Sequence, residues 1–243
     1  MMISHSSRSN DRFATTRWSV VMHTAATPSE DGRSALTELV QRYWYPVYAY
    51  VRRCGHTPAI ARDITGSFLK HLMHAFHADQ AGAPRGDFRR YLLSRLHAFL
   101  GSDWKESIAD DPAAELTAPA DLEQRFERDS ASAASPEEAY QRGFALEVIS
   151  RAFKRLRSEA NRAGHLIMYE ALQPHLSQDP GPGEYEAIAQ RLNSRPLALV
   201  VALKRLRQRF RELVGEELAD TVTSAEELAT EQDALHAVLV GMR

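Results

Sequence analysis

The stretch EYEAIAQRLNSRPLALVVALKRLRQRFREL, residues 184–213, decides the fold of the second half of the chain. It predicts a short helix, a tight turn and a longer second helix. Asn193 suits the turn because asparagine tolerates the left-handed backbone conformation, and Pro196 suits the first turn of the next helix. Beyond it, apolar residues recur every three or four positions with Lys and Arg between them, namely Leu199, Leu203, Leu206, Phe210 and Leu213. This pattern is typical of a helix-turn-helix whose second helix faces DNA phosphates, although a solvated basic helix on any bundle shares part of it.

Helical spacing also dominates the rest of the chain, and strand-like alternation is almost absent. The apolar residues of 34–53, 58–77 and 87–100 each form a stripe, and we expect a bend or break at Pro46. Ser135 and Ser224 each precede a glutamate by three residues, which is the pattern of a capping box at the start of a helix. The sequence therefore predicts an all-α fold.

The composition gives 243 residues with a net charge of −2 and a single cysteine, Cys54. A lone cysteine cannot form an intramolecular disulfide, which favours a reducing compartment. No apolar run reaches membrane-spanning length, and the first residues lack the apolar centre of a signal peptide. We therefore expect a cytoplasmic protein with no membrane partner. Its charge is uneven, being basic around 204–211 and acidic in 110–129 and 216–233, and this asymmetry is more informative than the net value.

Composition divides the predicted helices into two small domains. An N-terminal arm, 1–33, precedes a first helical domain, 34–106. Residues 107–134 are rich in Ala, Asp, Glu and Ser and lack an apolar face, so we expect an acidic linker that is flexible at least in part. The helix-turn-helix domain occupies 135–215, and a C-terminal helical extension occupies 216–243. The sequence leaves open whether this extension packs on the second domain or contacts another protein.

Five segments in a fixed order carry a resemblance to a known family. They are FATTRWSVV (13–21), YWYPVYAYVRR (43–53), GDFRRYLLSRLHAFLGSDW (86–104), YEAIAQRL (185–192) and LKRLRQRFRELVGEELADTV (203–222). Together they resemble bacterial sigma-70-type factors of the extracytoplasmic-function group, in a subgroup with a Thr-Thr-Arg-Trp start and a C-terminal extension. The resemblance implies a promoter-melting domain joined by a linker to a helix-turn-helix domain. It also implies a non-enzymatic protein that binds core RNA polymerase and directs promoter recognition and transcription initiation.

The resemblance implies DNA contacts in both domains. Aromatic and cationic side chains suit unstacked promoter bases, and the candidates in the first domain are Arg89, Arg90, Tyr91, Arg95, Trp104 and Lys105. We expect these arginines to point outward, whereas Tyr91 and Trp104 suit a core position equally well. The loop 78–87 corresponds to the family's pocket for a flipped base. In the second domain the start of the recognition helix is expected to enter a major groove, with the candidates Arg195, Leu197, Ala198 and Val200, followed by Lys204, Arg205 and Arg207 for phosphates.

The chain departs from the family at three places. Asn193 stands where the family has a glycine at the turn. Val200 can touch a thymine methyl group but cannot form a hydrogen bond where the family has a polar residue. In addition, the helix that docks on the polymerase carries an acidic stretch in the family, and the aligned residues 60–67 keep only Asp63. Either a weaker or different contact with the polymerase suffices, or docking is conditional on phosphorylation by a Ser/Thr kinase, because a phosphate adds nearly two negative charges. Thr65 is the preferred acceptor and Ser67 the second.

The predicted linker contains more acids than bases, and it allows two interpretations. Either it occupies a positive channel of the polymerase that is built for RNA, or it is a passive tether. The acids concerned are Asp110, Asp111, Glu115, Asp121, Glu123 and Glu127.

No pattern in the sequence indicates an enzyme, and we expect no catalytic residue, cofactor or metal. His71, His74 and His77 progress around their helix instead of stacking on one face, which disfavours a metal site. Cys54 lies near His56 but has no third group to orient it, as an activated thiol requires. Two alternatives to a sigma factor remain open, a stand-alone helix-turn-helix regulator and a sigma-like adaptor that has lost promoter recognition.

Overall fold

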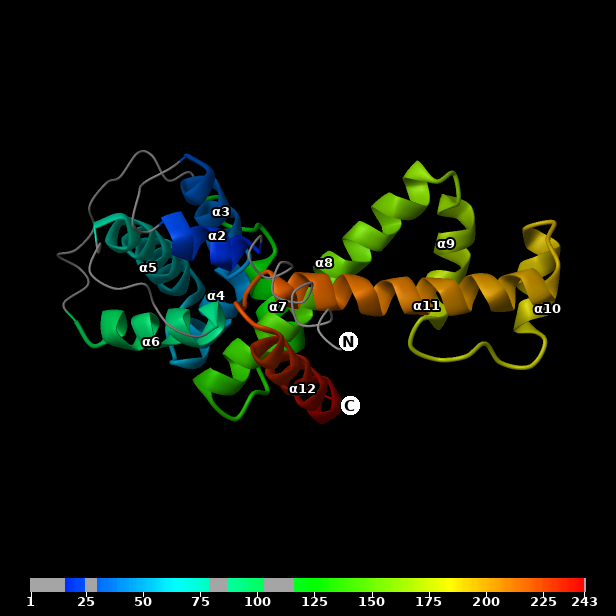
Figure 1. Cartoon of the computed structure of the whole chain (residues 1–243). Helices are drawn as coiled ribbons and strands as arrows, with labels where there is room; N and C mark the ends of the chain where they lie inside the picture. The colour runs from blue at the N-terminus through cyan, green and yellow to red at the C-terminus, as the bar shows by residue number, and fades with distance from the viewer. Residues whose placement is uncertain (1–15, 25–29, 79–86, 103–115, 243) are drawn as a thin grey trace, which may run out of the picture. The chain divides into compact units, whose positions relative to one another are not determined.

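Helices make up the regular structure of the residues that this computed structural model describes, which are 16–24, 30–78, 87–102 and 116–242, so the all-α class is confirmed. Figure 1 shows their order along the chain. The helices are α2 (Arg17–Thr24), α3 (Glu30–Gln41), α4 (Trp44–Arg53), α5 (Pro58–Ala78), α6 (Phe88–Leu100), α7 (Leu122–Asp129), α8 (Pro136–Arg162), α9 (Leu166–Leu172), η2 (Gln173–His175), α10 (Glu184–Arg191), α11 (Pro196–Ala219) and α12 (Ala225–Gly241).

Local sequence signals place several helix ends as predicted. The hydroxyl of Ser135 accepts a hydrogen bond from Glu138 N at 3.1 Å, and that of Ser224 accepts one from Glu227 N at 3.2 Å. Each glutamate also accepts a backbone N–H bond near the helix start, so the first turns are capped in both directions. The expected break at Pro46 falls slightly earlier, between α3 and α4. Pro46 lies in the first turn of α4, where its missing N–H costs no helical hydrogen bond.

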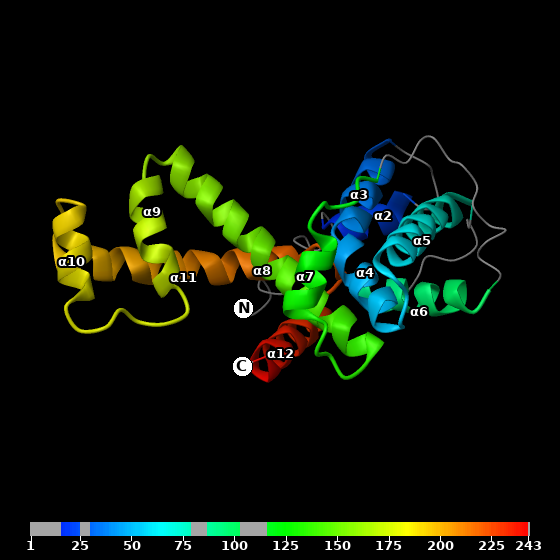
Figure 2. The same ribbon diagram turned by 180° about the vertical axis from the view of Figure 1, so that it is seen from behind.

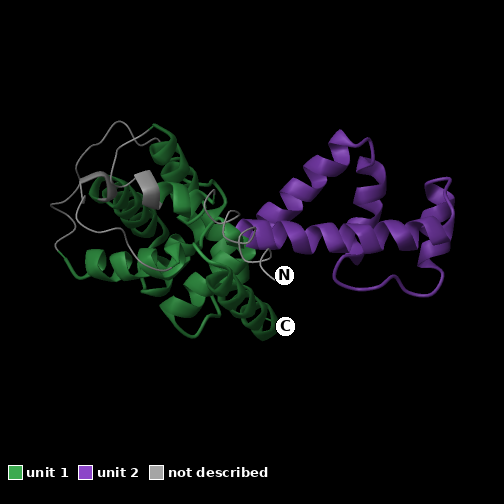
Figure 3. Ribbon diagram, viewed as in Figure 1, with its two compact units in different colours: residues 1–147, 218–243 green, residues 148–217 purple. Residues whose placement is uncertain are grey.

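The chain divides into two compact units that differ from the predicted domains (Figure 3). Unit 1 contains residues 1–147 together with 218–243, and unit 2 contains residues 148–217. The described part of the predicted arm, the described part of the predicted linker and residues 218–243 of the predicted C-terminal extension belong to unit 1. Unit 2 is therefore an insertion in the sequence of unit 1, so these units differ from the consecutive domains that composition predicts.

Aromatic side chains from four segments form the centre of unit 1. Tyr43, the residue before α4, is fully buried, and its ring lies 5.1 Å from that of Phe88 on α6 and 5.5 Å from that of Phe144 on α8. Trp18, also fully buried, contacts Phe88 with ring centroids 4.8 Å apart. Gly143 lets α8 approach α4 closely, since a Cβ there would lie 3.0 Å from the Cα of Pro46. The aromatic cluster thus joins α2, the start of α4, α6 and α8.

The C-terminal extension, from Leu218 onward, is part of unit 1 and is held by residues of the N-terminal half of the chain. The backbone oxygen of Asp220 accepts from Trp18 N at 3.0 Å, and that of Thr221 accepts from Phe88 N at 2.9 Å. The carboxylate of Asp220 binds both Arg17 and Arg42. The Thr-Thr-Arg-Trp motif, as far as it is described, is therefore held by residues about 200 positions later in the chain.

A buried ion pair fixes α12 to α6. Arg89 donates two hydrogen bonds to the carboxylate of Glu231, at 2.6 and 2.8 Å, and Glu231 is only 1% exposed. The guanidinium also binds the Gln141 side chain and lies over the Phe144 ring. Burial alone would lower the pKa of Arg89, but the hydrogen bonds and charge of Glu231 outweigh burial and raise it.

The described part of the predicted linker is folded, so the prediction of a flexible tether is wrong for residues 116–134. Helix α7 packs on α4, and Glu123 binds both Arg52, at 2.6 and 2.8 Å, and the Tyr48 hydroxyl, at 2.5 Å. The hydrogen bond from Arg52 is the main cause that holds the pKa of Glu123 below its usual range. Glu123 is therefore neutralised within unit 1. The linker acids Asp110, Asp111 and Glu115 lie outside the described residues.

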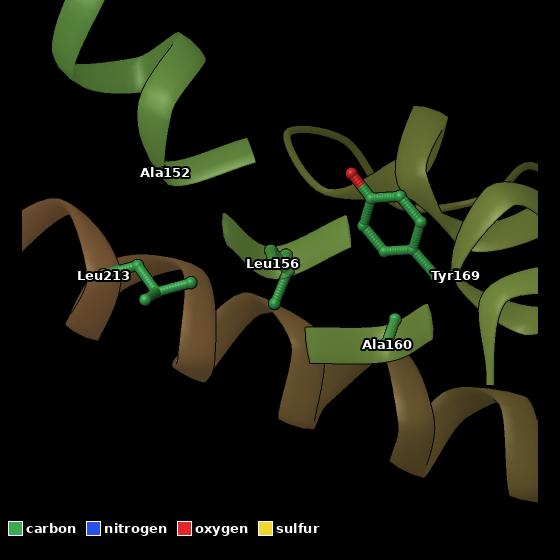
Figure 4. Close-up of a cluster of buried hydrophobic side chains, with 5 residues drawn as sticks. All are labelled: Ala152, Leu156, Ala160, Tyr169 and Leu213. Atoms are coloured by element: carbon green, nitrogen blue, oxygen red, sulfur yellow. The ribbon is translucent and has the colours of Figure 1, made fainter. Parts of the chain in front are cut away.

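Unit 2 has two adjoining apolar clusters. One joins Ala152, Leu156 and Ala160 of α8 to Tyr169 of α9 and Leu213 of α11 (Figure 4). Ion pairs reinforce the contact between α8 and α11, because Arg209 binds Glu159 at 2.8 Å and Arg155 binds Glu217 at 2.9 Å. The second cluster packs α9, α10 and α11 together through Leu172, Ile188, Ala189, Leu199 and Leu203.

We expect Glu231→Gln to destabilise unit 1 by about 3–5 kcal/mol, because it leaves the buried charge of Arg89 without a counter-ion. Equilibrium unfolding in urea, followed by circular dichroism, measures the change. The control is Asp233→Asn, an exposed position on the same helix, which is expected to change stability by less than about 0.5 kcal/mol. Equal unfolding midpoints for the Glu231 variant and the unaltered protein would show that the ion pair contributes nothing.

Candidate nucleic-acid interface

The turn between α10 and α11 has the geometry that the sequence predicts. Asn193 has φ +47° and is the one non-glycine residue with positive φ among the described residues. Its N–H binds Gln190 O at 3.2 Å, and Ser194 N binds Ala189 O at 2.9 Å. These two bonds form a Schellman motif, in which the left-handed residue ends one helix and reverses the chain. Pro196 then occupies the first position of α11.

The first two turns of α11 present an apolar surface to solvent. Leu197 is 74% exposed, Val200 42% and Val201 44%. Arg195 and Ala198 are exposed beside them, while Leu199 and Leu203 are buried against α9 and α10. The structure therefore brings the predicted residues Arg195, Leu197, Ala198 and Val200 together at the exposed end of the helix. Most of these side chains cannot form hydrogen bonds with base edges.

Only part of the basic face of α11 is available for an external anion. Lys204 and Arg205 are exposed. Arg207 binds Asp179 at 2.6 Å and the backbone oxygen of His175 at 2.7 Å. Arg209 binds Glu159, Glu212 and Glu216, and the hydrogen bond with Glu159 is the main cause that raises its pKa. Of the three phosphate candidates, Lys204 and Arg205 stay accessible and Arg207 is engaged by an acid.

The expected outward position of Arg89 on α6 is wrong, because its side chain is buried against Glu231. Arg90 is exposed and forms a 3.1 Å ion pair with Asp87. Tyr91 and Arg95 are half-buried and four residues apart, so they share a helix face. The Tyr91 ring lies 5.8 Å from that of Trp18. Trp104, Lys105 and most of the loop 78–87 lie outside the described residues.

Helix α5 places the expected polymerase-binding residues on different faces. Thr65 is fully buried, and its hydroxyl donates to Ala61 O at 2.7 Å. A kinase cannot reach a hydroxyl in that position, so the choice of Thr65 as the preferred phosphate acceptor is wrong. Asp63 is exposed together with Ile60 and Arg62, and Ser67 is half-buried. The sequence could not distinguish Thr65 from Ser67, because both interrupt an apolar pattern with a hydroxyl.

The cysteine and the possible metal ligands of the described residues are also singled out by the sequence. Cys54 lies at the surface, but its thiol is partly buried. This partial burial is the main cause that raises the pKa of the thiol, and the charge of Glu137 is the second. The raised pKa lowers the fraction of reactive thiolate. Within the described ranges, no group of three or more His, Cys, Asp or Glu side chains is placed to hold a metal ion. None of the helices described here has the length and apolar character needed to cross a bilayer.

Comparison of the chain with protein families, with curated proteins and with solved structures finds no match.

We expect Asn193→Ala to lower the stability of unit 2 by about 1 kcal/mol, since alanine pays the steric cost of the left-handed conformation. Asn193→Gly is expected to be neutral or slightly stabilising for the same reason. Thermal unfolding followed by circular dichroism measures both, with Gln190→Ala on the exposed face of α10 as the control. A similar loss of stability in the alanine and glycine variants would show that the left-handed backbone conformation at this position is not the cause of the loss.

Proposed function

We propose that the chain is a sigma factor, which binds core RNA polymerase and directs it to promoters. The observation that carries the proposal is that helices on two different compact units each present accessible cations, Arg90 and the half-buried Arg95 on α6 in unit 1 and Lys204 and Arg205 on α11 in unit 2. A sigma factor needs two such surfaces, because it binds duplex DNA at one element and unstacked bases at another. The order of the motifs along the chain supports the same assignment.

In this proposal each unit has a separate task. Lys204 and Arg205 of unit 2 bind phosphates beside a major groove, while the start of α11 lies over the bases. Arg90, Tyr91 and Arg95 of unit 1 hold unstacked bases, since aromatic rings stack on bases and arginines neutralise the backbone. Arg89 takes a structural role instead, because Glu231 already occupies its hydrogen-bond donors.

Docking on the polymerase is proposed to use the exposed face of α5. That face carries Ile60, Arg62 and Asp63, so it lacks the acidic stretch of the family that the chain resembles. A phosphate on Ser67, added by a Ser/Thr kinase, supplies the missing negative charge next to Asp63 on the following turn. Thr65 has no part in this step because it is buried.

A sigma-like adaptor is the second candidate function, and one observation favours it. The exposed end of α11 is mostly apolar, with Leu197, Val200 and Val201 facing solvent. Such a surface suits a protein or ligand better than base edges. A stand-alone regulator needs only one surface that binds duplex DNA. That function would give the exposed face of α6 no role.

We expect Arg90→Gln/Arg95→Gln to reduce promoter opening by about tenfold, because the single strand loses hydrogen bonds to charged groups, which are worth about 1.5–3 kcal/mol each. Permanganate reactivity of unpaired thymines, measured with core polymerase, reports opening, and footprinting of the same complexes reports binding. The control is Arg33→Gln, an exposed arginine on α3.

Two outcomes would contradict the sigma-factor proposal. Tight sequence-specific protection by the isolated protein indicates a stand-alone regulator. Binding to core polymerase with no protected promoter indicates an adaptor.

We expect Ser67→Glu to bind core polymerase more tightly than the unmodified protein, by about threefold or more, since each added charge strengthens complementarity with a basic surface. Ser67→Ala is expected to bind like the unmodified protein and to be insensitive to kinase treatment. Surface plasmon resonance measures both, with Thr230→Glu on the exposed face of α12 as a matched control. Equal affinity of the Ser67 and Thr230 glutamate variants would refute conditional docking.

A further inference from the structure

Unit 2 contains a groove of about 770 Å³ between α8, α9 and α11. These three helices enclose a triangle in both views of the chain (Figures 1 and 2). The close-up in Figure 4 shows Leu156, Ala160 and Tyr169 over α11, and these three side chains line the groove. The volume lies within the range of about 300–1,000 Å³ that is usual for small-molecule sites.

Short side chains create this space. Ala160 of α8 and Ala163, which follows the end of α8, line the groove on one side, and Ala198 and Ala202 line it from α11, where they are four residues apart on one face. Protein interiors are normally close-packed, so four alanines facing one volume leave room that the described side chains do not fill. Met168 of α9 contributes a flexible apolar wall. The groove therefore offers a continuous apolar surface to an external molecule.

The rim of the groove carries uncompensated positive charge. Arg195 and Arg205 line it and are exposed, and neither forms an ion pair with another described residue at 4.0 Å or less. The acid that lines the groove, Glu159, is bound by Arg209 at 2.8 and 2.9 Å. An incoming anion thus meets two available guanidinium groups, and the nearest carboxylate is already paired.

We propose that the groove binds a free medium-chain alkyl carboxylate, with the alkyl chain along α11 and the acid group at Arg195. The apolar lining runs along α11 from Leu197 to Leu206, which is about 13 Å at 1.5 Å per residue. That length suits an extended alkyl chain of medium length. Arg195 lies at the N-terminal end of α11, where the helix dipole adds to the attraction of an anion, and the paired Glu159 lies toward the other end.

Binding in the groove has a consequence for DNA that rests on the proposed function. Arg195, Leu197 and Ala198 belong both to the groove and to the end of α11 that is expected to face the promoter. A bound carboxylate and a DNA duplex therefore exclude each other at this end of the helix. Promoter recognition is therefore expected to weaken as the concentration of the carboxylate rises.

The test uses the full chain alone, with neither polymerase nor DNA, so its result does not depend on the proposed function. Isothermal titration calorimetry with dodecanoate below its critical micelle concentration is expected to show saturable binding at one site. Octanoate is expected to bind more weakly, because each buried methylene strengthens binding by about two- to fourfold. Dodecyltrimethylammonium and dodecyl maltoside, which have the same chain without the negative charge, are expected to bind at least about tenfold more weakly.

Matched variants locate the site. Val201→Glu places a carboxylate in the groove and is expected to abolish binding, whereas Val200→Glu, equally exposed but outside the groove, is expected to leave it unchanged. Arg195→Gln is expected to weaken binding by about tenfold, and Lys204→Gln, also outside the groove, by less than about twofold. Circular dichroism checks that each variant is folded.

Three results would overturn the proposal. The first is the absence of saturable dodecanoate binding to the folded protein. The second is equal loss of affinity in the Val200 and Val201 variants. The third is binding to vesicles of anionic phospholipid without binding to dodecanoate, which would assign the surface to a membrane. Promoter opening by a protein that binds no dodecanoate would contradict the groove proposal and leave the sigma-factor proposal intact. Dodecanoate binding by a protein that does not bind core polymerase would contradict the sigma-factor proposal and leave the groove proposal intact.

Discussion

The ion pair between Arg89 and Glu231 is the constraint on which unit 1 depends. Two charges removed from water cost several kcal/mol each unless their hydrogen-bonding groups are satisfied. Here the carboxylate accepts two bonds, a third guanidinium nitrogen donates to Gln141, and the guanidinium lies over the Phe144 ring. The same junction carries the backbone bonds that bring Asp220 to Trp18 and Thr221 to Phe88. The N-terminal motif, the aromatic cluster and the C-terminal helix are therefore held together at one junction.

Internal pairing also decides which cations are available to partners. The chain has 30 basic and 32 acidic side chains, so nearly every arginine can find an acid within the molecule. Arg17, Arg52, Arg89 and Arg209 have done so. Arg195, Lys204 and Arg205 stay accessible at α11 of unit 2, and Arg33, Arg62 and Arg90 are exposed in unit 1. A near-neutral protein can in this way keep local positive potential at surfaces where a partner binds.

Features set by neighbouring residues could be predicted from the sequence, and features set by distant residues could not. The left-handed Asn193, the first-turn Pro196 and the capping serines 135 and 224 follow from the chemistry of adjacent residues. The role of Arg89 depends on an acid 142 positions away, and that of Glu123 on an arginine 71 positions away. The groove also escaped prediction. Ala198 and Ala202 suggest a small-residue face, but only the position of α8 shows that the face is left unfilled.

The insertion of unit 2 within unit 1 has a consequence for how the chain is made. Synthesis proceeds from the N-terminus, and domains commonly fold as they emerge. Residues 16–147 cannot complete their core in that way, because three of them bind residues that are synthesised much later. The pairs are Trp18 with Asp220, Phe88 with Thr221, and Arg89 with Glu231. During that interval the buried tryptophan and the aromatic cluster lack part of their cover. Unit 2 has no such dependence, so the segment that begins later in the sequence is the one able to fold first on the ribosome.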